Sequence, residues 1–353
     1  MSQIKKIAVI GTGVIGAGWI IRCLAHNKIV HAFDKDIKLK KNLIAEIKRT
    51  WPYVKKLFNK KTLNLKNFRY FTSIEEALKD ADLVQECASE NYALKTKLMS
   101  TIGKYAKPNA IILSSSSGLL PTKIYSKCKN PERTMIGHPF NPVYLLPAVE
   151  IVPGKKTSKK FLDKAKKFYK TISMNPIMVK HELPGYLSDR LQEALWREGL
   201  HIINEGHATT EELDRAIEDG PGLRWSLMGT FLTFHLAGGK AGMRHMLEQF
   251  GPALKLPWTK LKAPTLSNKL IDRLVQGTKK QSKGKSVTKI LSEEDGYEVV
   301  PSTRSACVFS NLILYPNASD LSIIDMIFKS TDSVNSSLMY SRSSFIMVTL
   351  LSL

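Results

Sequence analysis

The chain has few cysteines and no long run of apolar residues, and both features exclude whole classes of protein. Its four cysteines, Cys23, Cys87, Cys128 and Cys307, are far apart and form neither a CxxC pair nor a Cys/His metal spacing. This spacing predicts free thiols in a reducing compartment and no metal site. No apolar run reaches the roughly 20 residues that a membrane span needs, and no leader pattern is visible at the N-terminus. We therefore expect a cytoplasmic protein with no membrane partner.

Acidic residues are also scarce, which raises the question of an anionic partner. The chain has 53 Lys and Arg against 31 Asp and Glu, giving a net charge of +22 and a pI near 9.7. Such a chain attracts anions and could bind nucleic acid. The lysines, however, are spread through many segments, and no basic-aromatic motif recurs. We expect a solvated basic surface that favours an anionic cofactor, and no nucleic-acid partner.

The first half of the chain carries short apolar runs of the kind found in buried parallel strands. They lie at 6–10, 29–33, 83–84, 110–113, 135–137 and 149–152, with helix-like stretches between them. Because 353 residues can bury the cores of two domains, we assign residues 1–183 to a first domain. Strands that alternate with helices predict an α/β fold, a doubly wound parallel sheet of the Rossmann type.

The alternation stops near Pro184-Gly185, and the following residues are typical of helices. Leu191, Leu195, Ile202 and Ile203 mark one face of a first helix, and Thr209 with Glu212 has the pattern of a second helix start. We therefore expect an all-helical second domain over residues 184–292. Residues 293–353 are Ser-rich and show no clear period, so we separate them as an atypical tail of undefined order.

A glycine-rich loop follows the first predicted strand, with the residues Gly11, Thr12, Gly13, Val14, Ile15 and Gly16. The pattern alone is weak, but here it precedes a helix and Asp34 follows at the end of the second strand. Gly11 permits a tight turn, Gly13 lets the backbone approach a pyrophosphate, and Gly16 allows close helix packing. Asp34 would accept hydrogen bonds from a ribose and repel a 2′-phosphate, so the loop predicts NAD rather than NADP. Lys35 could soften that preference.

Polar side chains follow two later strands, at the sheet edge where open α/β folds bind ligands. A serine run ending at Ser117-Gly118 comes after one strand, and His138 follows in Gly137-His138-Pro139. Glu150 is a charge inside an apolar strand and needs a buried partner. An imidazole and a carboxylate together could take the proton of an alcohol as hydride leaves. A lone histidine is nevertheless more often structural, and only geometry shows the pairing.

These stretches resemble the 3-hydroxyacyl-CoA dehydrogenase superfamily, whose members have a Rossmann domain and a helical dimerisation domain. The resemblance implies that His138 is the general base, with Glu150 as its paired acid and Ser117 at the substrate hydroxyl. It further implies that Asn141 lies on the nicotinamide side, that Glu90 and Lys95 contact the cofactor, and that the chain forms a homodimer.

The chain departs from the superfamily where the second domain opens. The usual GF-x-x-NR segment is replaced by residues 185–190, and Asp189 stands where an asparagine is usual. The following motifs, among them those around Trp196, Trp225 and Gly242-Met243, are similar to L-carnitine dehydrogenases. This similarity extends to about residue 290.

A carnitine substrate would need a site for its permanent trimethylammonium, which aromatic faces and a nearby carboxylate suit best. Asp189, Glu193 and Trp196 lie at helical spacing on one face. We interpret Asp189 and Trp196 as cation-binding, with Trp225 or Phe231 opposite. Alternatively these aromatics pack in a core and the carboxylates face solvent. The substrate carboxylate could be bound by several side chains that the sequence does not rank, namely Arg190, Arg197, Arg224 and Ser117.

The resemblance implies an NAD-dependent oxidation of L-carnitine to 3-dehydrocarnitine. Two other interpretations remain open within this fold. One is oxidation of a 3-hydroxyacyl-CoA or of a sugar acid such as gulonate. The other is a non-catalytic protein that uses the fold as a crystallin-like or NAD-sensing module, against which the intact Ser117, His138 and Glu150 argue.

Overall fold

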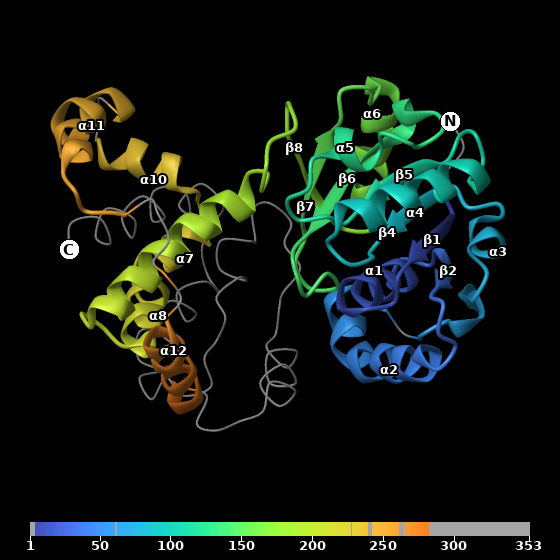
Figure 1. Cartoon of the computed structure of the whole chain (residues 1–353), viewed down its shortest axis with the longest axis horizontal. Helices are drawn as coiled ribbons and strands as arrows, with labels where there is room; N and C mark the ends of the chain where they lie inside the picture. The colour runs from blue at the N-terminus through green and yellow to red at the C-terminus, as the bar shows by residue number, and fades with distance from the viewer. Residues whose placement is uncertain are drawn as a thin grey trace, which may run out of the picture. The chain divides into compact units, whose positions relative to one another are not determined.

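The computed structural model describes residues 4–60, 62–226, 228–238, 242–260, 265 and 267–281 (Figure 1). Chain contacts divide it into two compact units, of which one reaches Glu198 and the next begins at Gly199. The predicted tail at 293–353, with Cys307, lies outside the described residues. Within those residues no helix is long and apolar enough to cross a membrane, and no His, Cys, Asp or Glu side chains group into a metal cluster.

The first unit is built on a sheet of eight strands in the order β3-β2-β1-β4-β5-β6-β7-β8. Neighbouring strands are parallel except β6 and β7, which are antiparallel. The prediction of a doubly wound, mainly parallel Rossmann sheet is therefore confirmed, and β7, which returns beside β6, adds one antiparallel pair. The sequence analysis also missed β3 and β8. The strands are β1 (Lys6–Ile10), β2 (Ile29–Phe33), β3 (Phe68–Phe71), β4 (Leu83–Glu86), β5 (Ile111–Ser114), β6 (Thr134–Pro139), β7 (Ala148–Pro153) and β8 (Asn175–Met178).

Helices cover both faces of this sheet, because successive residues of a buried strand point to opposite sides. In β1, Ile7 and Val9 join one apolar core, whereas Ala8 and Ile10 join the other. The first core is closed by α1 (Val14–Ala25), α2 (Leu39–Leu57) and α6 (Lys159–Thr171). The second is closed by α3 (Ile74–Leu78), α4 (Tyr92–Tyr105) and α5 (Pro121–Ile124).

The second unit is helical in its described residues, as predicted. Its elements are the end of α7 (Ser188–Glu205), α8 (Thr210–Glu218), α9 (Pro221–Trp225), α10 (Thr230–Ala237), α11 (Gly242–Phe250) and α12 (Asn268–Gln281). The predicted start of α8 is confirmed as a capping box, in which Thr209 and Glu212 bond each other's backbone N–H. From α12, Arg273 donates to the carbonyls of Ile203 and Asn204 at the end of α7.

The predicted apolar face of α7 is only partly buried. Ile203 is buried, but Leu191 and Leu195 are 72% and 46% exposed. The described residues of a single chain therefore do not cover the first turns of this helix.

Candidate active site

The glycine loop has the backbone geometry that a dinucleotide requires. Gly11 has a φ of +99°, and a Cβ added there would lie 2.9 Å from the carbonyl oxygen of Cys87. At Gly16 a Cβ would lie 1.9 Å from the Gly11 carbonyl oxygen. At Gly13 it would meet nothing within 4 Å, so open space borders the loop there. The first and last glycines are thus required by packing, and the middle one leaves room for a ligand.

The start of α1 and the end of β2 supply complementary charges for that ligand. Gly13 caps α1 without a side-chain hydrogen bond, and no acidic residue lies in the first helical turn, so the positive end of the helix is open to a pyrophosphate. Asp34 ends β2, and its Oδ2 accepts from the N–H and the hydroxyl of Thr12 at 3.0 Å each. These residues fit NAD, with Asp34 placed for a ribose.

The sheet register brings His138 and Glu150 together. They are directly opposite each other in the antiparallel pair β6–β7, so their side chains share one face. His138 Nδ1 lies 2.8 Å from Glu150 Oε2, and Glu150 is fully buried. An ionised carboxylate can only accept, so the Nδ1 proton faces Glu150 and Nε2 keeps its lone pair for a substrate. The predicted pairing is present.

The other oxygen of Glu150 is held by the start of α7. Gly185 and Tyr186 both have left-handed backbones, with φ of +70° and +45°, and the resulting turn aims two backbone N–H groups at Glu150. Leu187 and Ser188 each donate to Oε1 at 3.0 Å. Burial raises the pKa of Glu150, but the hydrogen bonds from His138 and from these two amides outweigh burial and lower it. Glu150 therefore stays ionised beside the imidazole.

Asp189 faces the reactive side of the same imidazole. Its Oδ2 lies 3.8 Å from His138 Nε2, and its side chain is 33% exposed. Burial raises the pKa of Asp189, and the nearby Glu150 adds to this rise, while His138 opposes it. A carboxylate thus borders the place where a substrate hydroxyl would meet the base.

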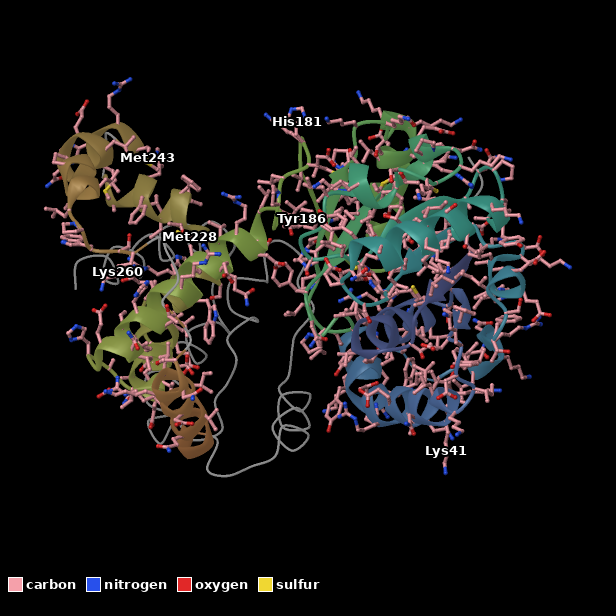
Figure 2. All side chains as sticks on the ribbon, viewed as in Figure 1. Lys41, His181, Tyr186, Met228, Met243 and Lys260 are labelled. Atoms are coloured by element: carbon pink, nitrogen blue, oxygen red, sulfur yellow. The ribbon has the colours of Figure 1, made fainter. Side chains whose placement is uncertain are left out.

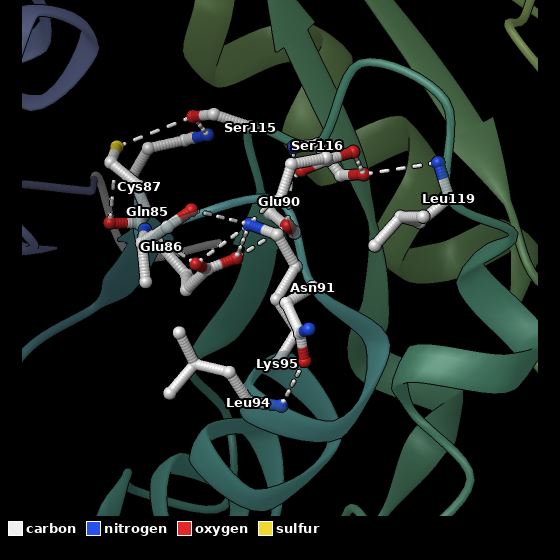
Figure 3. A network of polar contacts seen from close by, with 12 residues as sticks. Gln85, Glu86, Cys87, Glu90, Asn91, Leu94, Lys95, Ser115, Ser116 and Leu119 are labelled. Carbon is white, nitrogen blue, oxygen red and sulfur yellow. Dashed lines mark hydrogen bonds and ion pairs between the residues drawn. The ribbon is translucent and has the colours of Figure 1, made fainter.

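Ser117 lies on an exposed loop after β5 whose backbone is held by Glu90. The Glu90 Oε1 accepts the N–H of Ser117 at 3.1 Å, the N–H of Gly118 at 3.3 Å, and the hydroxyl of Ser116. Figure 3 shows the Ser116 contact from Glu90 and the bond from Leu119 N–H to the Ser116 hydroxyl. The serine run is therefore a defined structure, with the Ser117 side chain free for a ligand.

Tyr186, labelled in Figure 2, holds the far end of the serine loop, and the sequence analysis missed it. Its phenol is fully buried and donates to the Leu119 carbonyl at 2.7 Å, while its ring lies 5.6 Å from that of His138. The GF-x-x-NR segment that is usual in the superfamily has phenylalanine at this position. The additional hydroxyl of Tyr186 was therefore the sequence signal that could have indicated its hydrogen-bonding role. Tyr186 thus links the serine loop to the His138 side of the site.

The loop that carries Asn141 is tied to α1 by a buried arginine. Arg22 donates to the carbonyls of Val143, Leu145 and Leu146 in this loop, at 2.7 to 3.2 Å. It also donates to two carbonyls beyond α6, those of Ile172 and Ser173. Asn141 itself is exposed. Arg22 therefore uses its whole donor fork on backbone, and this fork fixes the chain that follows His138.

The remaining predicted residues differ in their exposure. Lys95 is 1% exposed, with its ammonium bonded inside the protein. Trp196 lies on α7 and is 55% exposed, and Trp225 ends α9 in the second unit and is 40% exposed. Both indoles present surface that a ligand could cover.

Comparison with known proteins assigns both halves of the chain to one family. Residues 6–182 match the NAD binding domain of 3-hydroxyacyl-CoA dehydrogenase, and residues 185–285 match the C-terminal domain of the same enzyme. Solved structures share the fold at low identity. A 5-formyl-3-hydroxy-2-methylpyridine 4-carboxylic acid 5-dehydrogenase has a TM-score of 0.68 and 22% identity, covering 86% of this chain and 93% of that one. A (S)-3-hydroxybutyryl-CoA dehydrogenase from Ralstonia eutropha has a TM-score of 0.57 and 23% identity, covering 84% and 95%.

Curated relatives are much more similar in sequence. L-carnitine dehydrogenase of Oceanobacillus iheyensis is 50% identical over 295 residues, which are 84% of this chain and 96% of that protein. The enzyme of the same name from Pseudomonas putida is 50% identical over 287 residues, covering 81% and 89%. The Bacillus cereus enzyme is 47% identical over 296 residues, covering 84% and 91%. The chain therefore belongs to the 3-hydroxyacyl-CoA dehydrogenase family of NAD-dependent oxidoreductases.

Proposed function

We propose that this protein oxidises the secondary alcohol of L-carnitine to the ketone of 3-dehydrocarnitine, with NAD as hydride acceptor. The observation that carries the substrate assignment is the Asp189 carboxylate 3.8 Å from His138 Nε2. The curated relatives that are about half identical to this chain support the assignment, since they carry the name L-carnitine dehydrogenase. The catalytic roles follow from the dyad and the loops around it.

His138 Nε2 accepts the hydroxyl proton while the carbinol carbon gives up its hydride. Glu150 orients the ring through Nδ1 and stabilises the imidazolium that forms. Ser117 donates to or accepts from the same hydroxyl and so aims it at Nε2. NAD would supply the two-electron acceptor and would be held by the glycine loop and Asp34, with Asn141 on the nicotinamide side and Glu90 as a further cofactor contact. The proton thus goes to His138 and the hydride would go to NAD, which balances the oxidation of the alcohol to the ketone.

Asp189 is placed to attract the trimethylammonium. In carnitine two carbon atoms separate the hydroxyl oxygen from the nitrogen, so these atoms are about 3–4 Å apart. A hydroxyl held at His138 Nε2 therefore brings the cation to the carboxylate beside that nitrogen. A quaternary ammonium has no proton to donate, so it binds through charge and an aromatic face, which Trp196 on the same helix would provide.

The same geometry disfavours the other substrates and a non-catalytic role. The acyl chain of a 3-hydroxyacyl-CoA is neutral next to its hydroxyl, and gulonate carries hydroxyls there, so neither gives Asp189 a counterion. A structural protein would not need an ionised Glu150 aligned on a histidine whose other nitrogen keeps its lone pair for a substrate. These contrasts favour an enzyme for a cationic hydroxy acid.

The proposal is tested with purified protein, NAD and each candidate substrate, followed by NADH absorbance. We expect turnover with L-carnitine and NAD, and far less with NADP, since Asp34 repels a 2′-phosphate. Activity on a 3-hydroxyacyl-CoA or on gulonate without activity on L-carnitine would contradict the proposal.

Asp189→Asn is expected to raise the KM for L-carnitine about tenfold or more, equivalent to about 1.4 kcal/mol, because the amide keeps the shape and removes the charge. In the unsubstituted enzyme, KM should also rise as the pH falls through the raised pKa of Asp189, since protonation neutralises the carboxylate. Four neighbouring charges affect this pKa: one lowers it, His138, and three raise it, Glu150, Glu90 and Glu193. This acid-side rise in KM should disappear in Asp189→Asn.

Asp163→Asn is the matched control for Asp189→Asn. It makes the same change in net charge on exposed α6, and KM should stay within about twofold of the unsubstituted value. An unchanged KM in Asp189→Asn would place the carboxylate away from the ammonium.

The proposal includes a cytoplasmic homodimer. Large apolar side chains are exposed on the second unit of a single chain, among them Phe231 at 81%, Leu254 at 83% and Trp258 at 72%. Exposed apolar area of this kind favours association. The described cysteines are unpaired, which suits a reducing compartment. Light scattering on the purified protein measures the oligomeric state directly, and a monomer at micromolar concentration would contradict the dimer.

A further inference from the structure

A buried carboxylate that no proposed role uses lies behind the serine loop. Glu86 ends β4, is fully buried, and has both oxygens occupied (Figure 3). Lys95 Nζ donates to Oε1 at 2.9 Å and to Oε2 at 3.0 Å, the Ala88 N–H donates to Oε1 at 2.6 Å, and the Ser114 hydroxyl donates to Oε2 at 2.5 Å. Glu86 is a charge at the end of an apolar strand, a signal that the sequence analysis did not use.

Lys95 connects this carboxylate to a second one. Its ammonium is 1% exposed and gives its remaining proton to the Ala88 carbonyl at 2.9 Å. Its three donors are therefore all used within the protein. The same Nζ lies 3.5 Å from Oε2 of Glu90, whose side chain is 38% exposed. One buried cation thus lies between a fully buried carboxylate and one at the surface.

Glu90 in turn holds the loop that carries Ser117. Its Oε2 faces Lys95, while its Oε1 accepts from the backbone of Ser117 and Gly118 and from the Ser116 hydroxyl. A half-exposed glutamate would ordinarily sample several rotamers. Here the ammonium restrains one oxygen and the loop restrains the other, so the position of Ser117 depends on where Lys95 is held.

We propose that Glu86 is a positioning residue for Ser117, acting through Lys95 and Glu90. This inference rests on the proposed function, because that function places Ser117 at the substrate hydroxyl. Burying the Glu86–Lys95 ion pair costs desolvation energy, so the pair is weak evidence for a stabilising role. A role in fixing the position of Ser117 explains why the pair is present. Lys95 in this role acts on the substrate side of the site through Glu90.

The test compares Lys95→Met with Lys97→Met, which makes the same substitution at an exposed position on α4. Lys95→Met should lower kcat about ten- to a hundredfold, because the hydroxyl is held less well. The dissociation constant of NADH, measured by fluorescence, should change less than about threefold. Lys97→Met should match the unsubstituted enzyme in both. Lys95→Arg, which restores the cation, should recover part of kcat.

Removal of Lys95 alone leaves Glu86 charged and buried without its partner, which could prevent folding. A second variant therefore tests the inference without an unpaired buried charge. The double variant Glu86→Met, Lys95→Met replaces the pair by apolar side chains, an exchange that buried pairs often tolerate. It should remain folded, show the same loss of kcat, and speed amide hydrogen exchange in residues 115–119 while β5 stays protected. The exchange readout does not depend on the substrate.

The outcomes separate this inference from the proposed function. An unsubstituted enzyme that is inactive on L-carnitine would overturn the proposed substrate only, and hydrogen exchange would still decide the positioning role. NADH binding that weakens tenfold in Lys95→Met, with kcat unchanged at saturating NAD, would assign the pair to the cofactor and overturn the inference. A folded double variant with native kcat and native exchange would also overturn it.

Discussion

His138→Asn is expected to lower kcat for L-carnitine oxidation about 10²- to 10⁴-fold, the usual contribution of a positioned general base. Asparagine can still donate a hydrogen bond toward Glu150, so the buried carboxylate keeps a partner, but the imidazole that takes the hydroxyl proton is lost. The binding of NADH should be nearly unchanged, because the glycine loop and Asp34 are untouched. Steady-state NADH production and NADH fluorescence titration measure the two effects separately.

His181→Asn is the control for that substitution. His181 is exposed after β8 and, in Figure 2, lies apart from Tyr186. Its kinetics should match those of the unsubstituted enzyme. If His138→Asn kept more than about a tenth of kcat, another group would have to be the base and the mechanism would be wrong.

Glu150→Gln is expected to lower kcat about 10³- to 10⁴-fold, as carboxylate-to-amide changes do in other His–carboxylate pairs. The direction of the amide is dictated by α7. The N–H groups of Leu187 and Ser188 require an acceptor where Oε1 now lies. The amide oxygen therefore takes that place, and the amide nitrogen faces His138 Nδ1. The ring must then accept at Nδ1 and carry its proton on Nε2, where the substrate needs a lone pair.

A histidine held in the wrong tautomer can be recognised from the dependence of kcat on pH. Raising the pH rescues a base that is merely protonated, but it does not move the proton of a neutral ring from one nitrogen to the other. We therefore expect kcat of Glu150→Gln to stay low across the alkaline range, while thermal unfolding shows a folded protein. Recovery at high pH would show that Glu150 acts only by charge.

The cofactor half of the site could be predicted from the sequence because its signals are local. Gly11, Gly13 and Gly16 are six residues or fewer apart, and their roles follow from the turn between one strand and one helix. Asp34 follows at the end of the next strand, and its bonds to Thr12 place it at the loop as expected. The geometry of such a short segment follows from its local sequence, so the structure changed little in the prediction of the cofactor loop.

The substrate half depends on contacts between residues far apart in the chain. Nothing in the sequence shows that β7 runs antiparallel to β6, yet that register alone sets Glu150 opposite His138. The turn at Gly185 and Tyr186, which delivers two amides to Glu150 and sets Asp189 at the imidazole, was equally invisible. Glu86 and Lys95 illustrate the same limit, since a charge at a strand end indicates a buried partner without naming it.

The sequence by itself determined the fold class and the NAD loop, because these follow from period, from spacing and from residue chemistry, which are properties of the chain. The expected base, acid and hydroxyl-binding serine came from the resemblance to a known family. Only the tertiary structure decided that His138 has a carboxylate at each nitrogen, Glu150 at Nδ1 and Asp189 at Nε2. The reason is physical: a hydrogen bond or a charge contact acts over a few ångströms, and folding alone brings distant residues within that range.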